Sequence, residues 1–190
     1  MTPIVASTNI HIVGISGSLR KASYNTALLK AAQELLPDNV SIEIAEIGSL
    51  PLYNSDIDGE LRPQSVSDFR NILAKADAFV FVSPEYNYTI PGALKNAIDW
   101  ASRGEDSPMI NKPVALMGAT KGLWGTTRMQ QAFRPVFQYM NMLPVNKPEV
   151  LVAQAQTKFD SNLQLIDDPT KNIVRQQLEA LKKLTLQLRN

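Results

Sequence analysis

The feature that most constrains the fold of this chain is an alternation of short apolar runs with longer helical patterns. Five runs rich in branched apolar residues predict strands, and they lie at 10–15, 40–47, 78–83, 112–119 and 149–152. The segments between and after them have apolar residues at helical spacing, which predicts helices at 24–36, 65–75, 90–102, 126–140 and 170–188. This alternation predicts one parallel sheet with helices on both faces.

Five strands and five helices without an internal repeat fit one domain over residues 1–190. We expect the doubly wound, flavodoxin-like strand order 2-1-3-4-5, in which ligands bind beyond the carboxyl ends of the strands where the strand order reverses. That rule directs attention to the loops after Ile15, Ser83 and Met117. Residues that favour helix ends mark the boundaries: Pro91 opens the third helix, and Asp168 before Pro169 is expected to cap the last.

Composition excludes several classes of protein. The chain has no cysteine, which excludes disulfides, thiolate catalysis and iron–sulfur clusters. Its one histidine, His11, lies in an apolar run, so we expect a strand residue and no metal site. A net charge of +1 gives no basis for binding nucleic acid or an anionic membrane surface. No apolar run is long enough to span a bilayer, and residues 1–10 lack the pattern of a signal peptide, so we expect a soluble, cytoplasmic protein.

The first loop, SGSLRKASYN at 16–25, has the composition of an anion site. Its hydroxyls and Arg20 precede a helix, whose first N–H groups and dipole favour negative charge, and the side chain of Asn25 completes the set of donors. Because a G-x-G-x-x-G pattern is missing, a terminal monophosphate fits better than a dinucleotide pyrophosphate. The alternative is that Ser23 only caps the helix and the remainder is a solvated turn.

The second and third loops have the composition of a site for a flat ring. SPEYNYTIPGALKNAIDW at 83–100 places backbone donors and acceptors beside aromatic residues, with Asn87 as an amide partner. The alternative is that Tyr86 and Tyr88 are ordinary surface residues. MGATKGLWGTTR at 117–128 contains three glycines, which let the backbone approach a ligand closely. Its alternative is a flexible connection with Thr126 as a helix cap.

These loops resemble those of the NADPH-dependent FMN reductase family of flavodoxin-like proteins, the branch that includes chromate, quinone and azo-dye reductases. GSLRKASYN is similar to that family's LRxxSxN phosphate loop, and SPEYNYTIPGALKNAIDW is similar to its flavin-loop signature. KPVALMGATKG and GTTRMQQAFRPVF resemble the next strand, loop and helix, so the resemblance extends from about Ile10 to Val152. One departure is Gly125-Thr126, where the family often has paired glycines, and it leaves the shape of the third loop open.

The resemblance implies an FMN site built from all three loops. The residues implied to hold the FMN phosphate are Ser16, Ser18, Arg20, Ser23 and Asn25. Those implied to line the isoalloxazine ring are Pro84, Glu85, Tyr86 and Asn87, with Thr120 and Gly122 on its far side. We expect Glu85 to contact the ring through its backbone, and a side-chain acid–base role is the alternative.

The resemblance further implies an NAD(P)H-dependent FMN reductase or quinone reductase. In a ping-pong reaction, NADPH or NADH delivers hydride to flavin N5, and a small acceptor follows on the same face: a quinone, free flavin, an azo compound or chromate. No catalytic side chain is expected, because the flavin carries the chemistry and backbone donors stabilise its reduced form near N1. Arg103 and Lys121 are candidate contacts for NADPH, or else solvated surface charges.

Two other functions share the predicted fold. A flavodoxin-type electron carrier is the main alternative, but such carriers are usually strongly acidic, unlike a chain with a net charge of +1. A redox titration separates the two functions, because a carrier exchanges single electrons. A receiver-type signalling domain needs an acidic cluster and an aspartate at the end of the third strand, where this chain has Ser83-Pro84.

Apolar residues beyond the needs of one small core indicate self-association. Met140, Met142 and Trp124 belong to this surplus, and the loop at 48–64 is long enough to contact a neighbouring subunit. The resemblance implies a homodimer or homotetramer with flavin sites near subunit boundaries. The alternative is that a thick core buries these side chains.

Overall fold

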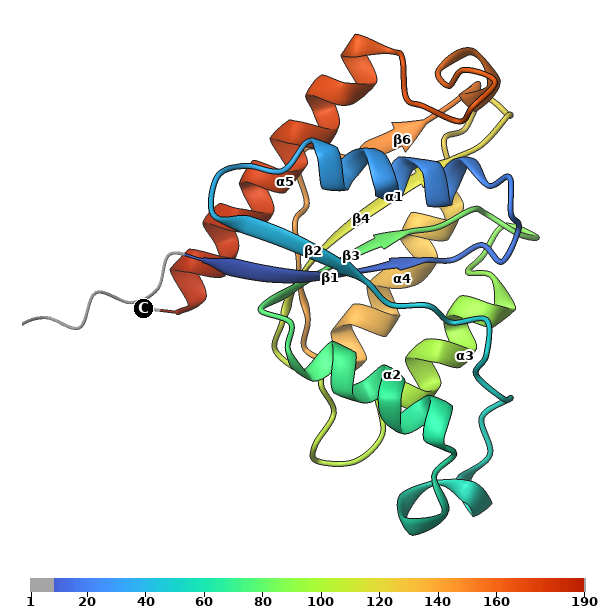
Figure 1. Cartoon of the computed structure of the whole chain (residues 1–190), viewed down its shortest axis with the longest axis vertical. Coiled ribbons are helices and arrows are strands. Elements are labelled where there is room, and N and C mark those ends of the chain that lie inside the picture. The colour runs from blue at the N-terminus through green and yellow to red at the C-terminus, as the bar shows by residue number, and fades with distance from the viewer. Residues whose placement is uncertain (1–8, 190) are drawn as a thin grey trace, which may run out of the picture.

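The computed structural model describes residues 9–189, in which one parallel sheet carries helices on both faces (Figure 1). Its strands are β1 (Ile10–Ser16), β2 (Val40–Ile44), β3 (Ala78–Val82), β4 (Pro113–Ala119), β5 (Leu143–Pro144) and β6 (Val150–Val152). The order is β2-β1-β3-β4-β5, with β6 paired to the second half of β4. The predicted flavodoxin-like order is therefore confirmed, and the predicted fifth strand is β6. The sequence analysis missed β5, a short strand beside the start of β4.

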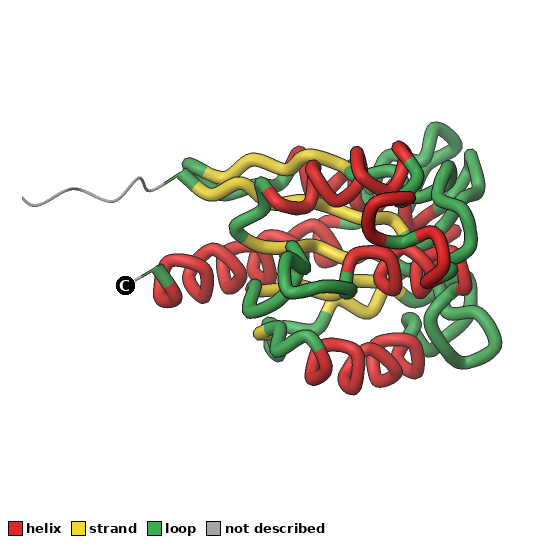
Figure 2. Tube along the Cα trace, turned by 90° about the horizontal axis from the view of Figure 1, so that it is seen from below, coloured by secondary structure: helices red, strands yellow, loops and turns green. Residues whose placement is uncertain are grey.

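Helices form a layer on each side of the sheet. They are α1 (Tyr24–Glu34), α2 (Gln64–Ala74), α3 (Gly92–Ala101), α4 (Thr127–Tyr139) and α5 (Asp168–Leu188). Figures 1 and 2 show α1 and α5 on one face and α2, α3 and α4 on the other, and the two buried apolar clusters follow this division. Every residue of β3 and β4 is buried, because helices cover both faces of these strands. This explains why their sequences are apolar throughout instead of alternating.

The last helix corrects the expected cap. Its N-cap is Asp167, whose carboxylate accepts a hydrogen bond from the backbone N–H of Thr170, whereas Asp168 is already the first helical residue. The apolar side chains at helical spacing along α5 include Val174, Leu178 and Leu181, which are fully buried. Towards the end of the helix, Leu184 is half-buried and Leu188 is 48% exposed.

The apolar surplus near the end of α4 is mostly core. Met140 and Met142 are 1% and 5% exposed, and both pack in the cluster beneath α2, α3 and α4. For these two residues the thick-core alternative is therefore the right one. Trp124 differs from them, because 68% of it is exposed on the loop that precedes α4.

The long segment between β2 and α2 is fastened to α3. Asn96 accepts a hydrogen bond from the backbone N–H of Tyr53 at 2.7 Å, and its amide donates to the carbonyl of Pro51 at 2.8 Å. The Trp100 indole donates to the same carbonyl at 2.8 Å, and the Tyr53 ring packs edge-on against that indole. Between these anchors Leu52 is 83% exposed. Contact of this segment with a neighbouring subunit stays a prediction.

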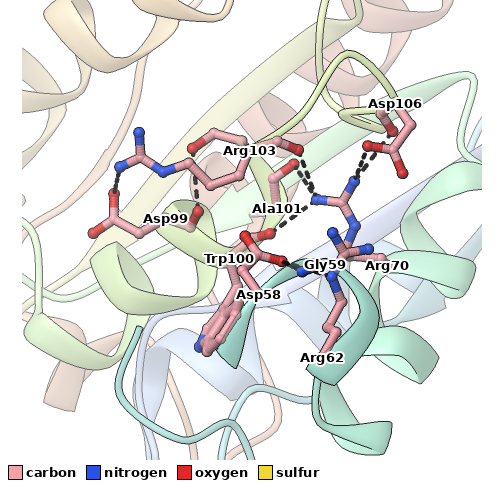
Figure 3. Close-up of polar contacts among 10 residues, drawn as sticks. Asp58, Gly59, Arg62, Arg70, Asp99, Trp100, Ala101, Arg103 and Asp106 are labelled. Carbon is pink, nitrogen blue, oxygen red and sulfur yellow. Dashed lines mark hydrogen bonds and ion pairs between the residues drawn. The ribbon is translucent and has the colours of Figure 1, made fainter. Parts of the chain in front are cut away.

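A buried arginine closes the C-terminal end of α3 (Figure 3). Arg70 of α2 is 5% exposed, and its guanidinium donates to the carbonyls of Trp100, Ala101 and Arg103 at 2.9–3.2 Å. It also forms an ion pair with Asp106 at 2.9 Å. The last carbonyls of a helix have no partner within the helix, so Arg70 supplies the donors that they need. The position of α3 is thereby fixed at the end opposite to the second loop.

Residues 1–8 and 190 lie outside the described residues. They include most of the segment at 1–10, which is predicted to lack the pattern of a signal peptide. One domain over 1–190 stays a prediction for the same reason. Within 9–189, no helix is long and apolar enough to cross a membrane, and no group of three or more ligating side chains is arranged to hold a metal. His11 is half-buried on β1, where its ring contacts Ser41 and Glu43 of β2.

The corrected cap gives a test of the fold with a matched control. Asp167→Ala removes the cap and the ion pair with Lys158, whose Nζ lies 2.7 Å from the carboxylate. We therefore expect this variant to lower the free energy of unfolding by about 1–2 kcal/mol. Asp168→Ala removes a side chain that is 89% exposed, so we expect a change below about 0.5 kcal/mol. Urea unfolding at neutral pH measures both values, and equal effects would refute the assignment of the cap.

The cap at Asp167 is also expected to make the stability of the fold depend on pH. Hydrogen bonds from Lys158 and Thr170 hold the pKa of Asp167 below its usual value of 3.8. A carboxyl with a lowered native pKa stabilises the fold fully above its ordinary pKa, and that stabilisation is lost as the pH falls through the native value. The difference in unfolding free energy between the wild type and Asp167→Ala is therefore expected to shrink below about pH 4.

Candidate functional site

The carboxyl ends of β1, β3 and β4 meet at one edge of the sheet, and the three polar loops follow them there (Figures 1 and 2). The backbone N–H of Gly17 donates to the carbonyl of Val82 at 2.9 Å, and that of Ser83 donates to Met117 at 3.0 Å. A Cβ atom at Gly17 would lie 2.4 Å from the Ser83 hydroxyl, so glycine is what lets the exits of β1 and β3 approach so closely. The structure thus brings together the three loops that the sequence predicts.

The first loop offers many unused donors. Within the part of the chain that the structure describes, the backbone N–H groups of Leu19, Lys21, Ala22 and Ser23 have no hydrogen-bond partner. The Arg20 side chain is exposed, and among residues 9–189 it donates only to the carbonyl of Ala22 at 3.3 Å. The Ser18 hydroxyl lies beside this loop and accepts a long hydrogen bond from the Arg20 N–H at 3.4 Å. An arginine with a row of free N–H groups before a helix is suited to hold an anion.

Other residues that were predicted to hold the phosphate instead form hydrogen bonds within the protein that support this loop. Ser23 is 3% exposed, and its hydroxyl caps α1 by accepting from the N–H groups of Asn25 and Thr26, as the capping alternative expected. Asn25 is 4% exposed, and its amide exchanges two hydrogen bonds with the backbone of Ala119 at 2.8 and 2.9 Å. Ser16 contacts the Thr26 hydroxyl at 2.8 Å. In this structure Asn25 joins the first loop to the end of β4.

The second loop turns back on itself through two residues with left-handed backbone. Tyr86 and Thr89 exchange both backbone hydrogen bonds, and between them Asn87 and Tyr88 have φ angles of 50° and 66°. Non-glycine residues rarely adopt this conformation, and a bulky tyrosine does so at an energetic cost. The turn projects Tyr86 and Tyr88, which are 45% and 68% exposed. Pro84 lies half-buried before the turn, at the exit of β3.

Glu85 connects the second loop to α4. Its carboxylate accepts hydrogen bonds from the backbone N–H groups of Arg128 at 2.9 Å and Met129 at 3.1 Å. These are among the first N–H groups of α4, which lack partners within the helix, and the helix dipole favours a carboxylate at this position. Thr126 occupies the N-cap position but forms no side-chain hydrogen bond there. Thr126 therefore stands where the alternative interpretation put it, but its side chain does not cap α4, and the carboxylate of Glu85, which is distant in sequence, does so.

The third loop contains two consecutive residues with left-handed backbone. Gly125 and Thr126 have φ angles of 55° and 67°, a conformation that glycine adopts freely and a β-branched residue does not. The Thr126 hydroxyl is buried and has no partner among the described residues. This explains why paired glycines suit this position in the family that the sequence resembles. Thr120 accepts a hydrogen bond from the Gly122 N–H at 3.2 Å, which orders the start of the loop.

Sequence reasoning missed Arg128, the first charged side chain of α4. Its guanidinium carbon lies 4.2 Å from the centre of the Tyr88 ring and 5.5 Å from that of Trp124, so it links the second loop to the third. The distance from its Nη1 to the Glu85 carboxylate is 3.5 Å. The GTTR sequence could have indicated this residue, because it places an arginine in the first turn of a predicted helix, directly after the third loop.

A groove of about 290 Å³ lies elsewhere, along α3 and α4. Its walls include Ile98, Pro135, Val136, Tyr139 and Met140, with Lys95, Asp99 and Arg103 at the rim. Arg103 stacks over the Tyr53 ring, with 5.0 Å from its guanidinium carbon to the ring centre. It is thus at the far end of α3 from the second loop. Lys121 is different, because it is exposed on the third loop itself.

Known proteins resemble this chain over nearly its whole length. A family model described as NADPH-dependent FMN reductase matches residues 10–157. An NAD(P)H-dependent FMN reductase of Pseudomonas aeruginosa is 45% identical over 183 residues, which cover 96% of this chain and 99% of the relative. An NAD(P)H:quinone oxidoreductase of Solanum tuberosum is 41% identical, with 98% of each chain covered. A quinone reductase of Escherichia coli K12 is 34% identical, with 92% of this chain and 94% of the relative covered.

Solved structures agree with these relatives. The flavoenzyme NAD(P)H:(acceptor) oxidoreductase FerB of Paracoccus denitrificans superimposes with a TM-score of 0.85 at 28% identity, covering 94% of this chain and 98% of that one. The strand order, the position of the three loops and the match of the family model all point the same way. The chain therefore belongs to the family of NADPH-dependent FMN reductases, and it is an oxidoreductase with FMN as its cofactor and NAD(P)H as its reductant.

Proposed function

We propose that this protein reduces small quinones with electrons from NAD(P)H in a ping-pong reaction. The observation that carries the proposal is the row of free N–H groups beside Arg20, at the sheet edge where the second and third loops converge. Several relatives are named as quinone reductases or quinone oxidoreductases, which supports a quinone over free flavin, an azo compound or chromate as the acceptor. Membership of an enzyme family favours this function over an electron carrier.

The first loop fits the phosphate of FMN. A phosphate carries about two negative charges and three strong acceptor oxygens at neutral pH. Arg20, the Ser18 hydroxyl and the free N–H groups before α1 supply donors for these oxygens, while the dipole of α1 favours the negative charge. In this proposal Ser16, Ser23 and Asn25 act from beneath, because their side chains bond to the protein and hold the loop in shape.

The second and third loops are proposed to hold the flavin ring. In this proposal one side of the ring faces Pro84, Glu85, Tyr86 and Asn87, and the other side faces Thr120 and Gly122. Backbone groups are the expected contacts, since the Glu85 carboxylate is engaged by the N-terminus of α4. This engagement argues against an acid–base role for the Glu85 side chain. Bound FMN supplies the hydride-transfer chemistry, so the protein needs to bind, orient and expose the ring.

The overall reaction balances without a catalytic side chain. NAD(P)H gives up a hydride and becomes NAD(P)⁺, and the quinone takes up two electrons and two protons to become a hydroquinone, with the second proton from water. The reductant and the acceptor bind in turn to the same open face, which is why we expect ping-pong kinetics. Lys121 is better placed than Arg103 to contact a phosphate of the reductant, because it is exposed on the third loop.

The groove between α3 and α4 supports self-association. Tyr139 is 72% exposed at its wall, and its rim carries both signs of charge on Lys95, Asp99 and Arg103. A surface with apolar walls and charges of both signs is suited to pair with a second copy of itself about a two-fold axis. We therefore propose a homodimer, or a homotetramer built from such dimers. The cytoplasmic location stays a prediction, since none of these contacts bears on it.

The proposed function makes a spectroscopic prediction. Purified protein is expected to be yellow from bound FMN and to lose its colour when NADPH is added under anaerobic conditions. Initial rates with varied NADPH and 1,4-benzoquinone are expected to give the parallel reciprocal plots of a ping-pong reaction. A protein that takes up no FMN would overturn the proposal, and intersecting plots would overturn its kinetic scheme.

The phosphate site is tested by Arg20→Ala. Loss of one charge-assisted hydrogen bond is expected to weaken FMN binding by about tenfold to a hundredfold. Titration of apoprotein with FMN, followed by quenching of flavin fluorescence, measures the change. Lys30→Ala is the matched control, because it removes the same charge from an exposed position on α1 away from the loop. Equal FMN affinity in wild type and Arg20→Ala would show that the phosphate is held elsewhere.

Self-association is tested by Tyr139→Asp. A charge on the groove wall is expected to oppose pairing through α3 and α4, so light scattering at micromolar concentration should show dimers or tetramers for the wild type and smaller species for the variant. Leu188→Asp, at an exposed position on α5, is the control and should leave the assembly unchanged. A monomeric wild-type protein would contradict the proposal.

A further inference from the structure

We infer that a groove between α1 and the loop at 159–165 binds the 2′-phosphate of NADPH, so that the enzyme prefers NADPH to NADH. The groove is called the lysine groove below, and its polar lining includes Lys21, Lys30, Asn162 and Gln164. The inference rests on the proposed function, because it assigns one part of the reductant to a surface of this chain. Neither lysine is among the residues predicted to hold FMN.

Small side chains form the floor of the lysine groove. Ala27 and Ala31 of α1 lie there beside Leu165, and all three belong to the buried apolar cluster on this side of the sheet. Larger side chains at the two alanine positions would fill the space that the groove occupies. The groove has a volume of about 120 Å³, which suits a compact group such as a phosphate better than a whole nucleotide.

The wall opposite α1 is a turn that its own hydrogen bonds hold in shape. The Asp160 carboxylate accepts from the backbone N–H groups of Asn162 at 2.9 Å and Gln164 at 2.8 Å. Just before this turn, the Phe159 ring packs on the Tyr24 ring of α1, with 5.4 Å between the ring centres. The wall is therefore fixed against the helix, and a ligand does not have to pay for ordering it.

The polar side chains of the lysine groove are not engaged by the protein. Lys21 and Lys30 are exposed, and neither forms an ion pair anywhere in residues 9–189. In the same part of the chain, Asn162 and Gln164 form hydrogen bonds through their backbones but not through their side-chain amides. Among the described residues that line the groove, Glu34 is the only acid. Two lysines against one carboxylate favour an anion here.

The lysine groove begins at the loop that is proposed to hold the FMN phosphate. Lys21 and Ser23 belong to both, and Lys30 lies six residues after Tyr24, the first residue of α1. At 1.5 Å per residue, the groove thus extends about 9 Å along the helix from the first loop. The nicotinamide half of the reductant has to approach the flavin, so the adenosine half is the part that can extend past the first loop into this groove.

The chemistry of the lysine groove defines the group that it binds. NADPH differs from NADH only by its 2′-phosphate, a group with about two negative charges and three strong acceptor oxygens at neutral pH. Lysine ammonium groups bind phosphate as point charges, and side-chain amides add neutral donors. NADH has a hydroxyl at the same place and leaves both lysine charges without a partner. The inference therefore predicts a preference between two reductants with the same hydride-donating ring.

The test compares NADPH with NADH as reductants for the FMN-loaded enzyme, with 1,4-benzoquinone as the acceptor. Lys30→Gln removes one charge, and we expect it to lower the ratio of kcat/KM values, NADPH over NADH, by about threefold to fivefold, as loss of one exposed charge contact implies. The double variant Lys21→Gln with Lys30→Gln should lower the ratio by about tenfold or more. The value for NADH should stay unchanged. Added salt should reduce the wild-type ratio, because exposed charges are screened.

Lys183→Gln is the matched control. Lys183 is exposed on α5 and does not line the lysine groove, so its removal changes the net charge equally and should leave the ratio unchanged. A fall of the same size in Lys183→Gln and Lys30→Gln would show that only overall charge matters and would overturn the inference. A wild type that uses NADPH and NADH equally well would overturn it too. FMN affinity of Lys30→Gln should equal that of the wild type, and a loss would show that Lys30 acts through FMN instead.

A binding measurement separates this inference from the proposed function. Calorimetric titration of the oxidised, FMN-loaded protein with NADP⁺ and with NAD⁺ requires no electron transfer. We expect tighter binding of NADP⁺ to the wild type and loss of that difference in the double variant. A wild type that shows the difference but reduces no quinone would overturn the proposed function and support the lysine groove. Equal binding of NADP⁺ and NAD⁺ to the wild type would overturn the lysine groove and leave the proposed function standing.

Inorganic phosphate distinguishes the two sources of a phosphate group. In the same titration, we expect inorganic phosphate to bind far more weakly than NADP⁺, because only the dinucleotide has further contacts along the site. If inorganic phosphate at the concentration of NADP⁺ removed the advantage of NADP⁺ over NAD⁺, the lysine groove would be a site for free phosphate. That result would overturn its assignment to the reductant.

Discussion

The pairing of β1 with β2 on one side and with β3 on the other determines where the polar loops of this protein gather. Both pairings are parallel, so the connections that follow β1 and β3 leave the same edge of the sheet. They then diverge, because α1 covers one face while α3 covers the other. In doubly wound folds such a divergence forms a crevice at the strand ends, and the loops at 16–25 and 84–89 follow β1 and β3 at that edge.

Side chains distant in sequence then fix the loops that border this space. Asn25 bonds both backbone groups of Ala119, 94 residues away, and so ties the first loop to the end of β4. Glu85 plays the corresponding part on the other side by capping α4 across 43 and 44 residues. At the far end of α3, Arg70 fastens the helix that follows the second loop. Because each contact satisfies buried backbone groups, moving one loop would leave donors or acceptors unpaired.

The sequence predicted most of this architecture, because strand and helix patterns are local. The strand order and the three loops followed from the alternation of apolar runs, and the family followed from the loop motifs. Contacts made across the fold were beyond it. Thr126 is a residue type that favours the N-cap position, yet its backbone is left-handed and its side chain forms no cap hydrogen bond, so the cap comes from Glu85. Met140 and Met142 were predicted to exceed the needs of the core, because the sequence does not show which side chains surround them, and in the fold they are buried. The neighbouring residues Asp167 and Asp168 were indistinguishable by residue type, but only Asp167 has the extended backbone and the contacts of a cap.

The double hydrogen bond of Asn25 has a consequence for the chemical durability of the site. Asparagine side chains age by deamidation, in which the following backbone nitrogen attacks the side-chain carbonyl. Here the N–H of Thr26, the nitrogen concerned, is held by the Ser23 hydroxyl inside the first turn of α1. The carbonyl that it would attack is held by the N–H of Ala119. The arrangement that joins the first loop to the end of β4 therefore also keeps apart the two atoms whose reaction would place a negative charge beneath the first loop.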